Sequence, residues 1–141
     1  MSGDLDIPPA APAVRVDLGK LEEAVEALKN HLRGSLLASS IWDRRTRTML
    51  VAFHSDGRAV PLFTDIADFI DEKLAKAGLP GIDQWSMDHL KGGHIGMVVR
   101  HGPDLMQGII LDGARAQSQL GLLFSVCVPQ LVASVKAARI G

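Results

Sequence analysis

Residues 94–124 read HIGMVVRHGPDLMQGIILDGARAQSQLGLLF, and this stretch decides the fold. It holds two short apolar runs, residues 95–99 and 105–111, on either side of Gly102 and Pro103. A Gly-Pro pair breaks regular structure and supplies a turn. Two apolar runs of this length joined by a turn predict a β-hairpin.

A pattern of helical period follows the hairpin. Apolar or small side chains recur three or four positions apart at Leu120, Leu123, Phe124, Cys127, Leu131, Ser134, Val135 and Ala138. This spacing places them on one face of a helix. Ser118 is predicted to cap its N-terminus. Pro129 has no backbone N–H and predicts a kink near Ser125. A buried hairpin leading into a long C-terminal helix is therefore the expected core.

Length and composition indicate one soluble globular domain. The chain has 141 residues, of which 47% are hydrophobic and 22% charged, and its formal net charge is −1. Such a charge gives no general attraction to nucleic acid or to an anionic membrane. The single cysteine excludes an intrachain disulfide. No apolar run approaches the roughly 18 residues of a membrane span. The N-terminus does not read as a signal peptide, so a cytoplasmic location is expected.

The rest of the chain predicts further strands and helices around the hairpin. Residues 1–16 are rich in Pro and Ala and are expected to form a flexible tail before a domain at 17–141. Besides the C-terminal helix, helices are predicted over residues 17–33, capped by Asp17, and from Thr64 or Asp65 to near Gly78. Besides the hairpin, strands are predicted at residues 35–42, 48–53 and 82–90. Five mostly antiparallel strands sandwiched by helices make an α+β fold.

This order of elements resembles the roadblock/dynein light chain family. Its members run helix, two strands, helix, three strands, helix, and the similar stretches here are residues 36–43, 97–99, 109–112 and 118–123. The resemblance covers roughly residues 17–139 and rests on apolar patterns. It implies a profilin-like sheet, and a homodimer in which the third strands pair and the second helices pack together. It also implies a non-catalytic regulator or scaffold that binds a small Ras-like GTPase.

Two surfaces are expected to carry this function. The strand at residues 82–90 is rather polar and belongs at a sheet edge, and an unpaired edge invites a second chain. The residues expected in the dimer interface are Phe69, Ile82, Trp85 and Met87. A GTPase-binding surface is expected on the second helix. Phe69 and Ile70 would supply its apolar centre, and its acidic rim would be made by Asp65, Asp68, Asp71 and Glu72. The basic tip of the first hairpin, with Arg44, Arg45 and Arg47, is the next candidate for a partner contact.

Residues that could support chemistry do not form a recognisable site. The spacing of His89, His94 and His101, with Asp88 and Asp104 nearby, matches no metal-ligand pattern. Cys127 lies on the apolar face of the last helix, where a buried inert thiol is expected. No catalytic residue, metal or cofactor is therefore predicted. The alternative function is a small-molecule sensor of the PAS or GAF type. Such a sensor needs a polar-lined internal pocket, whereas these strands are filled by apolar side chains.

Overall fold

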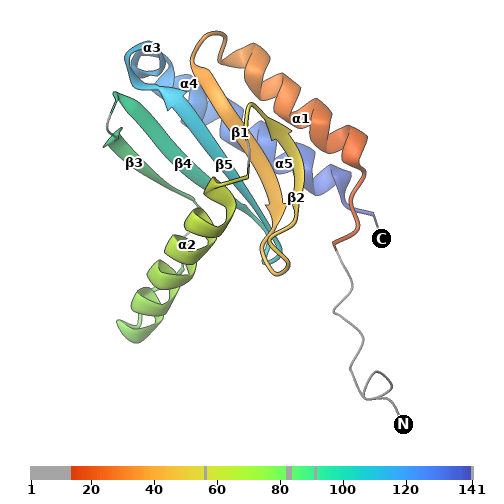
Figure 1. Cartoon of the computed structure of the whole chain (residues 1–141), viewed down its shortest axis with the longest axis vertical. Coiled ribbons are helices and arrows are strands. Elements are labelled where there is room, and N and C mark those ends of the chain that lie inside the picture. Colours follow the sequence, from red (N-terminus) through yellow and green to blue (C-terminus); the bar gives the residue numbers. More distant parts are fainter. Residues whose placement is uncertain (1–13, 56, 82–83, 91, 141) are drawn as a thin grey trace.

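A single five-stranded antiparallel sheet forms the centre of the computed structural model (Figure 1). The structure describes residues 14–55, 57–81 and 92–140 with their side chains, and residues 84–90 by their backbone. The strands are β1 (Leu36–Asp43), β2 (Met49–Phe53), β3 (Gln84–Leu90), β4 (His94–His101) and β5 (Leu105–Asp112), in the spatial order β2-β1-β5-β4-β3. Helices cover both faces, so the predicted α+β class is confirmed.

The hairpin predicted from residues 94–124 is formed by β4 and β5. Its register runs without interruption from His94 opposite Asp112 to His101 opposite Leu105. Gly102 makes the turn with a φ of 73°, a conformation that glycine adopts without steric cost. β5 also pairs with β1, so both of its edges are occupied. β3 pairs with β4 alone and lies at an edge of the sheet, as predicted for this strand.

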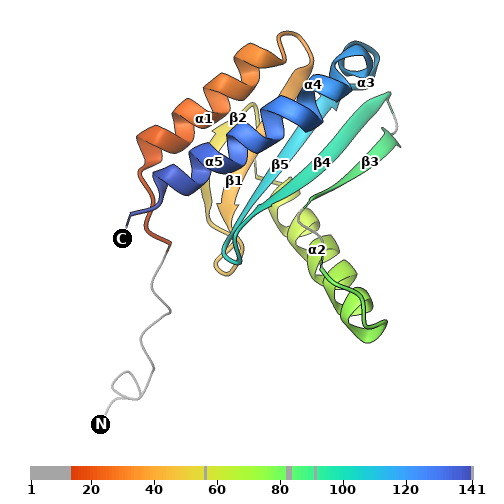
Figure 2. The ribbon, with the colours of Figure 1, turned by 180° about the vertical axis from the view of Figure 1, so that it is seen from behind.

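One face of the sheet is covered by two helical segments that lie side by side (Figure 2). The first is α1 (Leu18–His31), which Asp17 caps as predicted, its carboxylate accepting from the Lys20 N–H at 3.2 Å. Leu21 and Leu28 of this helix are buried in the core. The second is the C-terminal helical segment, which packs beside α1 and over β4 and β5. Burial of both apolar helix faces against the sheet supplies the core.

The C-terminal segment is longer and less regular than the single helix predicted from Ser118. It comprises α3 (Gly113–Ala116), the 3₁₀ turn η2 (Gln117–Gln119), α4 (Leu120–Leu122), the π-helical turn η3 (Leu123–Cys127) and α5 (Val128–Ala138). The prediction that Ser118 caps the helix is wrong. Asp112 caps it instead, accepting from the Ala114 N–H at 3.1 Å, because this carboxylate follows the strand directly. The disturbance expected near Ser125 is the π-helical turn, which ends just before Pro129.

By length and composition, the same segment would suffice to cross a membrane. Residues Gly113–Ala138 contain an 18-residue window with a mean hydropathy of 1.7. The expectation that no apolar run approaches a membrane span is therefore corrected. The segment is interrupted by Gln, Ser and Gly, but these uncharged residues lower the mean hydropathy too little to exclude a span. In the structure one side of the segment packs onto the sheet, and 28% of its most apolar window is buried.

The opposite face of the sheet carries α2 (Ala59–Lys76), which begins five residues before the predicted Thr64. Pro61 lies in its first turn, where its missing N–H costs nothing because those N–H groups have no helical partner. The prediction that Thr64 or Asp65 caps this helix is wrong. The Thr64 hydroxyl instead accepts from the indole N–H of Trp42 at 2.9 Å and donates to the Val60 carbonyl. The predicted end near Gly78 is confirmed, since Gly78 follows with a φ of 71°.

Candidate functional site

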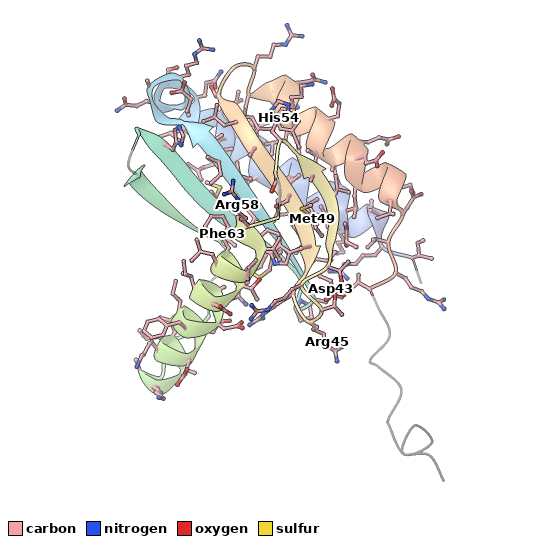
Figure 3. The ribbon with its side chains drawn as sticks, viewed as in Figure 1. Asp43, Arg45, Met49, His54, Arg58 and Phe63 are labelled. Carbon is pink, nitrogen blue, oxygen red and sulfur yellow. The ribbon has the colours of Figure 1, made fainter. Side chains whose placement is uncertain are left out.

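Helix α2 is attached to the sheet by its first half only. Its buried residues are Val60, Phe63, Thr64 and Ala67, and residues 68–76 include none. Val60, Phe63 and Ala67 pack with Trp42, Val98 and Met106 of the sheet. Gly108 of β5 lies beneath this contact, and a Cβ at that position would be 3.1 Å from the ring of Phe63. Figure 3 shows Phe63 directed from the start of the helix towards the sheet. The close approach of helix and sheet therefore depends on a glycine.

The second half of α2 extends beyond the sheet (Figure 1), and each half of this helix carries one large exposed apolar side chain. Phe69, which was expected both in the dimer interface and in the partner site, is 59% exposed. Leu62 is 55% exposed on the same helix. The ammonium of Lys73 lies 5.2 Å from the centroid of the Phe69 ring. Large exposed apolar residues on one helix are typical of surfaces that another protein covers.

Three of the acidic side chains of α2, Asp65, Asp68 and Glu72, are exposed and Asp71 is partly buried, and all four pair with basic side chains of the chain. Nη2 of Arg44 lies 2.5 Å from Oδ1 of Asp68 and 3.3 Å from Oδ2 of Asp71. Asp71 also pairs with Arg100 of β4 at 2.5 Å, where the Arg100 side chain is only 14% exposed. Two further acids are paired, Asp65 with Arg47 at 2.5 Å and Glu72 with Lys76 at 2.9 Å.

These contacts join three parts of the chain that sequence reasoning treated separately. The basic tip and the acidic rim were expected as two alternative partner surfaces, and the structure places them against each other. The tip is shaped by the buried carboxylate of Asp43, which accepts from the N–H groups of Arg45 and Thr46. Figure 3 shows Asp43 and Arg45 at this end of the first hairpin. An open hollow of about 380 Å³ lies between tip and helix, lined by Arg44, Arg45, Arg47, Asp68 and Pro103.

The other residues expected in the dimer interface lie in or near β3. Ile82 is outside the described residues, and so are the side chains of Trp85 and Met87. The backbone of β3 places Trp85 opposite Val98 and Met87 opposite Gly96. Because β3 is at the sheet edge, its second side is available for pairing with another strand.

Sequence reasoning missed a buried polar network that links strands β1, β4 and β5 of the sheet. The His101 ring lies 2.9 Å from the Gln107 side-chain oxygen, the Gln107 amide donates to Ser39 Oγ at 3.0 Å, and Ser39 donates to the Gly108 carbonyl. Burial lowers the pKa of His101 to about 4, against the opposing effect of the bond to Gln107. Gln107 within an otherwise apolar strand was the available signal, because a buried amide needs a partner.

Among residues 14–55, 57–81 and 92–140, no three His, Cys, Asp or Glu side chains group as metal ligands would. Cys127 is buried, as predicted, and burial raises the pKa of its thiol. A small hollow of about 40 Å³ lies between α1 and α5 and falls well below the roughly 300 Å³ of a typical ligand pocket. The larger hollow at the hairpin tip is open to solvent, which differs from the enclosed pocket of a sensor.

No family model matches the sequence, and no curated protein sequence matches it. MglB from Myxococcus xanthus superimposes with a TM-score of 0.72 at 8% identity, covering 93% of this chain and 98% of that one. The chain has the MglB fold. The resemblance to the roadblock family is thereby confirmed for the fold.

Two further MglB structures show the same likeness. The gliding protein MglB from Thermus thermophilus gives a TM-score of 0.69 at 14% identity, over 92% of this chain and 100% of that one. A structure described as MglB with tetrameric arrangement gives a TM-score of 0.69 at 14% identity, over 92% and 99% of the two chains. The match to MglB spans the sheet and the helices on both of its faces, because so little of either chain is left uncovered.

Proposed function

We propose that this chain is a homodimeric, non-catalytic regulator or scaffold that binds a small Ras-like GTPase. The observation that carries the proposal is the state of α2, which projects beyond the sheet with Phe69 and Leu62 exposed. Large apolar side chains exposed to water on a helix are unfavourable, and their burial against another surface is favourable. The MglB fold and the resemblance to the roadblock family support the choice of partner.

The dimer would use the open edge of the sheet together with α2. Pairing of β3 with β3 of a second copy would extend the sheet and satisfy backbone groups at its edge. Helix α2 lies on one face of that sheet, so two copies would present two α2 helices on the same side. Phe69 is the described residue of the expected interface, and its exposure in the single chain leaves it free to be buried between subunits.

The GTPase would bind across the paired α2 helices. Phe69 and Leu62 supply apolar contact, and Asp65, Asp68, Asp71 and Glu72 supply the polar rim. Because Arg44, Arg47 and Arg100 already pair with three of these acids, the rim has a smaller net negative field than the acids alone would give. Apolar contact, rather than long-range attraction, therefore provides the greater part of the expected affinity.

A capture experiment from the native cell tests the proposal. Tagged wild-type protein is compared with Phe69→Glu and with the matched control Leu18→Glu, a change at an apolar residue of similar exposure on α1. Captured proteins are identified by mass spectrometry with a GTP analogue or GDP present. We expect a small GTPase with the wild type and with the control, and its loss with Phe69→Glu. Absence of any small GTPase, or equal recovery with all three proteins, would overturn the proposed binding surface.

Light scattering tests the dimer separately. We expect a mass close to twice the chain mass of 15.1 kDa for the wild type and for Leu18→Glu, and a shift towards one chain mass for Phe69→Glu. A wild type that stays at one chain mass throughout the micromolar range contradicts dimerisation. An unchanged dimer in Phe69→Glu places the interface away from α2.

A further inference from the structure

The hollow at the tip of the first hairpin, called the tip hollow below, is lined mainly by arginines. Its volume is about 380 Å³, and its lining consists of Arg44, Arg45, Arg47, Asp68 and Pro103. Three arginines and one aspartate leave an excess of positive charge in this lining. The whole chain has a formal net charge of −1, so the positive excess is local. A local field of one sign attracts groups of the opposite sign.

Arg45 is the arginine of the tip hollow that the chain itself leaves without a partner. In the described part of the chain, its guanidinium takes part in no hydrogen bond or ion pair, and the residue is exposed. Its neighbours Arg44 and Arg47 each contact carboxylates of α2 instead. Figure 3 shows Arg45 at the outer end of the hairpin. The N–H donors of its guanidinium are therefore available to another molecule.

The backbone that carries these arginines is fixed before any partner binds. The Asp43 carboxylate, with the residue only 4% exposed, accepts from the Arg45 N–H at 2.8 Å and from the Thr46 N–H at 3.2 Å. The Arg44 N–H donates to the carbonyl of Asp104 at 2.8 Å, which holds the tip against the turn between β4 and β5. Only side chains are then left to be ordered on binding, and this lowers the entropic cost of a contact.

Arg47 occupies a backbone conformation that favours glycine. Its φ is 61°, in the left-handed region where a side chain meets steric resistance. The ion pair between Arg47 and Asp65 joins two exposed side chains, and such pairs stabilise a protein little. Stability therefore does not explain the arginine, since glycine would fit this turn better. Backbone strain of this kind is retained where a side chain is needed for function.

From these observations we infer that the tip hollow is an anion-binding site, centred on Arg45 and Arg47, that takes the carboxylates of an acidic segment of a partner protein. Arginine clusters recognise acidic motifs because the planar guanidinium presents several N–H donors to carboxylate oxygens. The chain shows this chemistry in the same hollow, where Nε and Nη2 of Arg44 both donate to the Asp68 carboxylate.

The exposed carboxylate of Asp68 distinguishes a protein segment from a phosphate group as the occupant. This side chain is 49% exposed and adds a hydrogen-bond acceptor to a lining that otherwise offers donors. A peptide supplies carboxylates for the arginines together with backbone N–H donors for Asp68. A phosphate ionised at neutral pH supplies acceptors alone and leaves Asp68 without a donor. The mixed lining therefore favours an acidic protein segment.

Fluorescence anisotropy with a labelled hexaglutamate peptide and the full chain tests this site. We expect Arg45→Glu to weaken binding of the peptide about tenfold or more, because a repulsive charge replaces an attractive one. The matched control is Arg33→Glu, the same change of charge at an exposed arginine for which the described part of the chain offers no ion pair. It should leave the affinity nearly unchanged. Binding by the wild type should weaken as salt is added, since exposed charges are screened.

Arg47→Gly separates binding by the tip from its folding. Glycine adopts a φ of 61° without steric cost, so this variant should be at least as stable in urea as the wild type and yet bind the peptide more weakly. Unchanged affinity in a stable Arg47→Gly variant would overturn the inference. Phe69→Ala removes an exposed ring of the proposed GTPase surface and should bind the peptide as the wild type does. Failure of the GTPase proposal is thereby distinguished from failure of this one.

Three further results would count against the tip hollow as a carboxylate site. One is equal affinity of the wild type and Arg45→Glu for the peptide. Another is an equal loss of affinity in Arg33→Glu, which would show a general attraction to positive charge. The last is binding of inorganic pyrophosphate that depends on Arg45 in a protein that does not bind the glutamate peptide. That result would assign the hollow to phosphate groups.

Discussion

Arg44 and Asp68 lie on different elements, and the Arg44 Nη2 atom is 2.5 Å from Oδ1 of Asp68. This ion pair joins the tip of the first hairpin to the part of α2 that has no buried residue. The same arginine reaches Asp71, which Arg100 of β4 also contacts. The projecting half of α2 is therefore held by charge, whereas its first half is held by apolar packing.

Removing Asp71 tests how much this charged contact contributes. We expect Asp71→Ala to lower the free energy of unfolding by about 1 kcal/mol, because two arginines lose a shared partner and one of them, Arg100, is largely buried. The control Glu72→Ala removes an acid paired only with Lys76 on the same helix, and a loss of at most about 0.5 kcal/mol is expected. Urea unfolding of the two variants measures both. Equal losses of unfolding free energy in the two variants would show that the contact between hairpin and helix stabilises the protein no more than the ion pair within the helix does.

Gly108 sets the distance between α2 and the sheet. A Cβ there would lie 3.1 Å from Phe63 and 3.3 Å from Trp42, so we expect Gly108→Ala to cost about 1–3 kcal/mol through overpacking. Gly121 is the control, since a Cβ added there meets nothing within 4 Å and alanine favours a helix. Thermal unfolding should show a lower melting temperature for Gly108→Ala and no loss for Gly121→Ala. A Gly108→Ala variant as stable as the wild type would mean that α2 moves away from the sheet without cost.

Because the ring of His101 is buried, we expect the protein to lose stability in mild acid. Its pKa is lowered from 6.5 to about 4 by burial, so the folded protein favours the neutral ring and the unfolded chain takes up the proton first. The contribution of the neutral ring to the free energy of unfolding is therefore fully present above pH 6.5. It is lost as the pH drops towards 4, and the loss is about 3 kcal/mol in all. The pKa of Asp104 is also lowered, by its bond to Arg139, and protonation of this carboxyl adds a loss only below its ordinary value of 3.8.

The measurement is the free energy of unfolding at several pH values between 7 and 4. His101→Gln is the comparison, because it keeps a polar partner for Gln107 but carries no titrating ring. We expect the variant to be less stable at pH 7 and to lose less stability on acidification than the wild type. Parallel curves for the two proteins would exclude His101 as the source of the pH dependence.

Cys127 is expected to be structural rather than reactive. Because the thiol is buried and its pKa raised, we expect no labelling by a disulfide reagent at pH 8 while the protein is folded, and full labelling in denaturant. Cys127→Ala should lower stability by about 1 kcal/mol and leave partner binding unchanged. Rapid labelling of the folded protein, or loss of binding by a stable Cys127→Ala variant, would contradict this assignment.

Features fixed by neighbouring residues could be predicted from the sequence. The β4–β5 hairpin follows from two apolar runs around Gly102, and the start of α1 follows from Asp17. Errors arose where two local signals competed. The second helix was predicted to begin at Thr64 or Asp65, although Pro61 before it is a residue that is also common in the first turn of a helix. Ser118 was predicted to cap the last helix, whereas the cap is Asp112 at the end of β5.

The candidate site depended on contacts that no local pattern contains. Arg44 meets Asp68 across 24 positions of sequence, and Arg100 meets Asp71 across 29. The tip and the rim could each be recognised as charged, but their mutual distance is set by how α2 packs on Trp42 and Gly108. The exposure of Phe69 likewise depends on where the sheet ends. The interface residues Trp85, Met87 and Ile82 remain predictions.

The π-helical turn Leu123–Cys127 fixes the rotational phase between the two halves of the last helix. A π turn holds about one residue more than an α turn, and each residue rotates an α-helix by about 100°. Deleting one residue from this turn would give a more regular helix. It would also rotate Ala116 and the turns around it away from the sheet while Leu131 and Val135 stayed in place. The length of this turn is therefore under structural constraint, and single-residue deletions here should be tolerated less well than substitutions at Ser125.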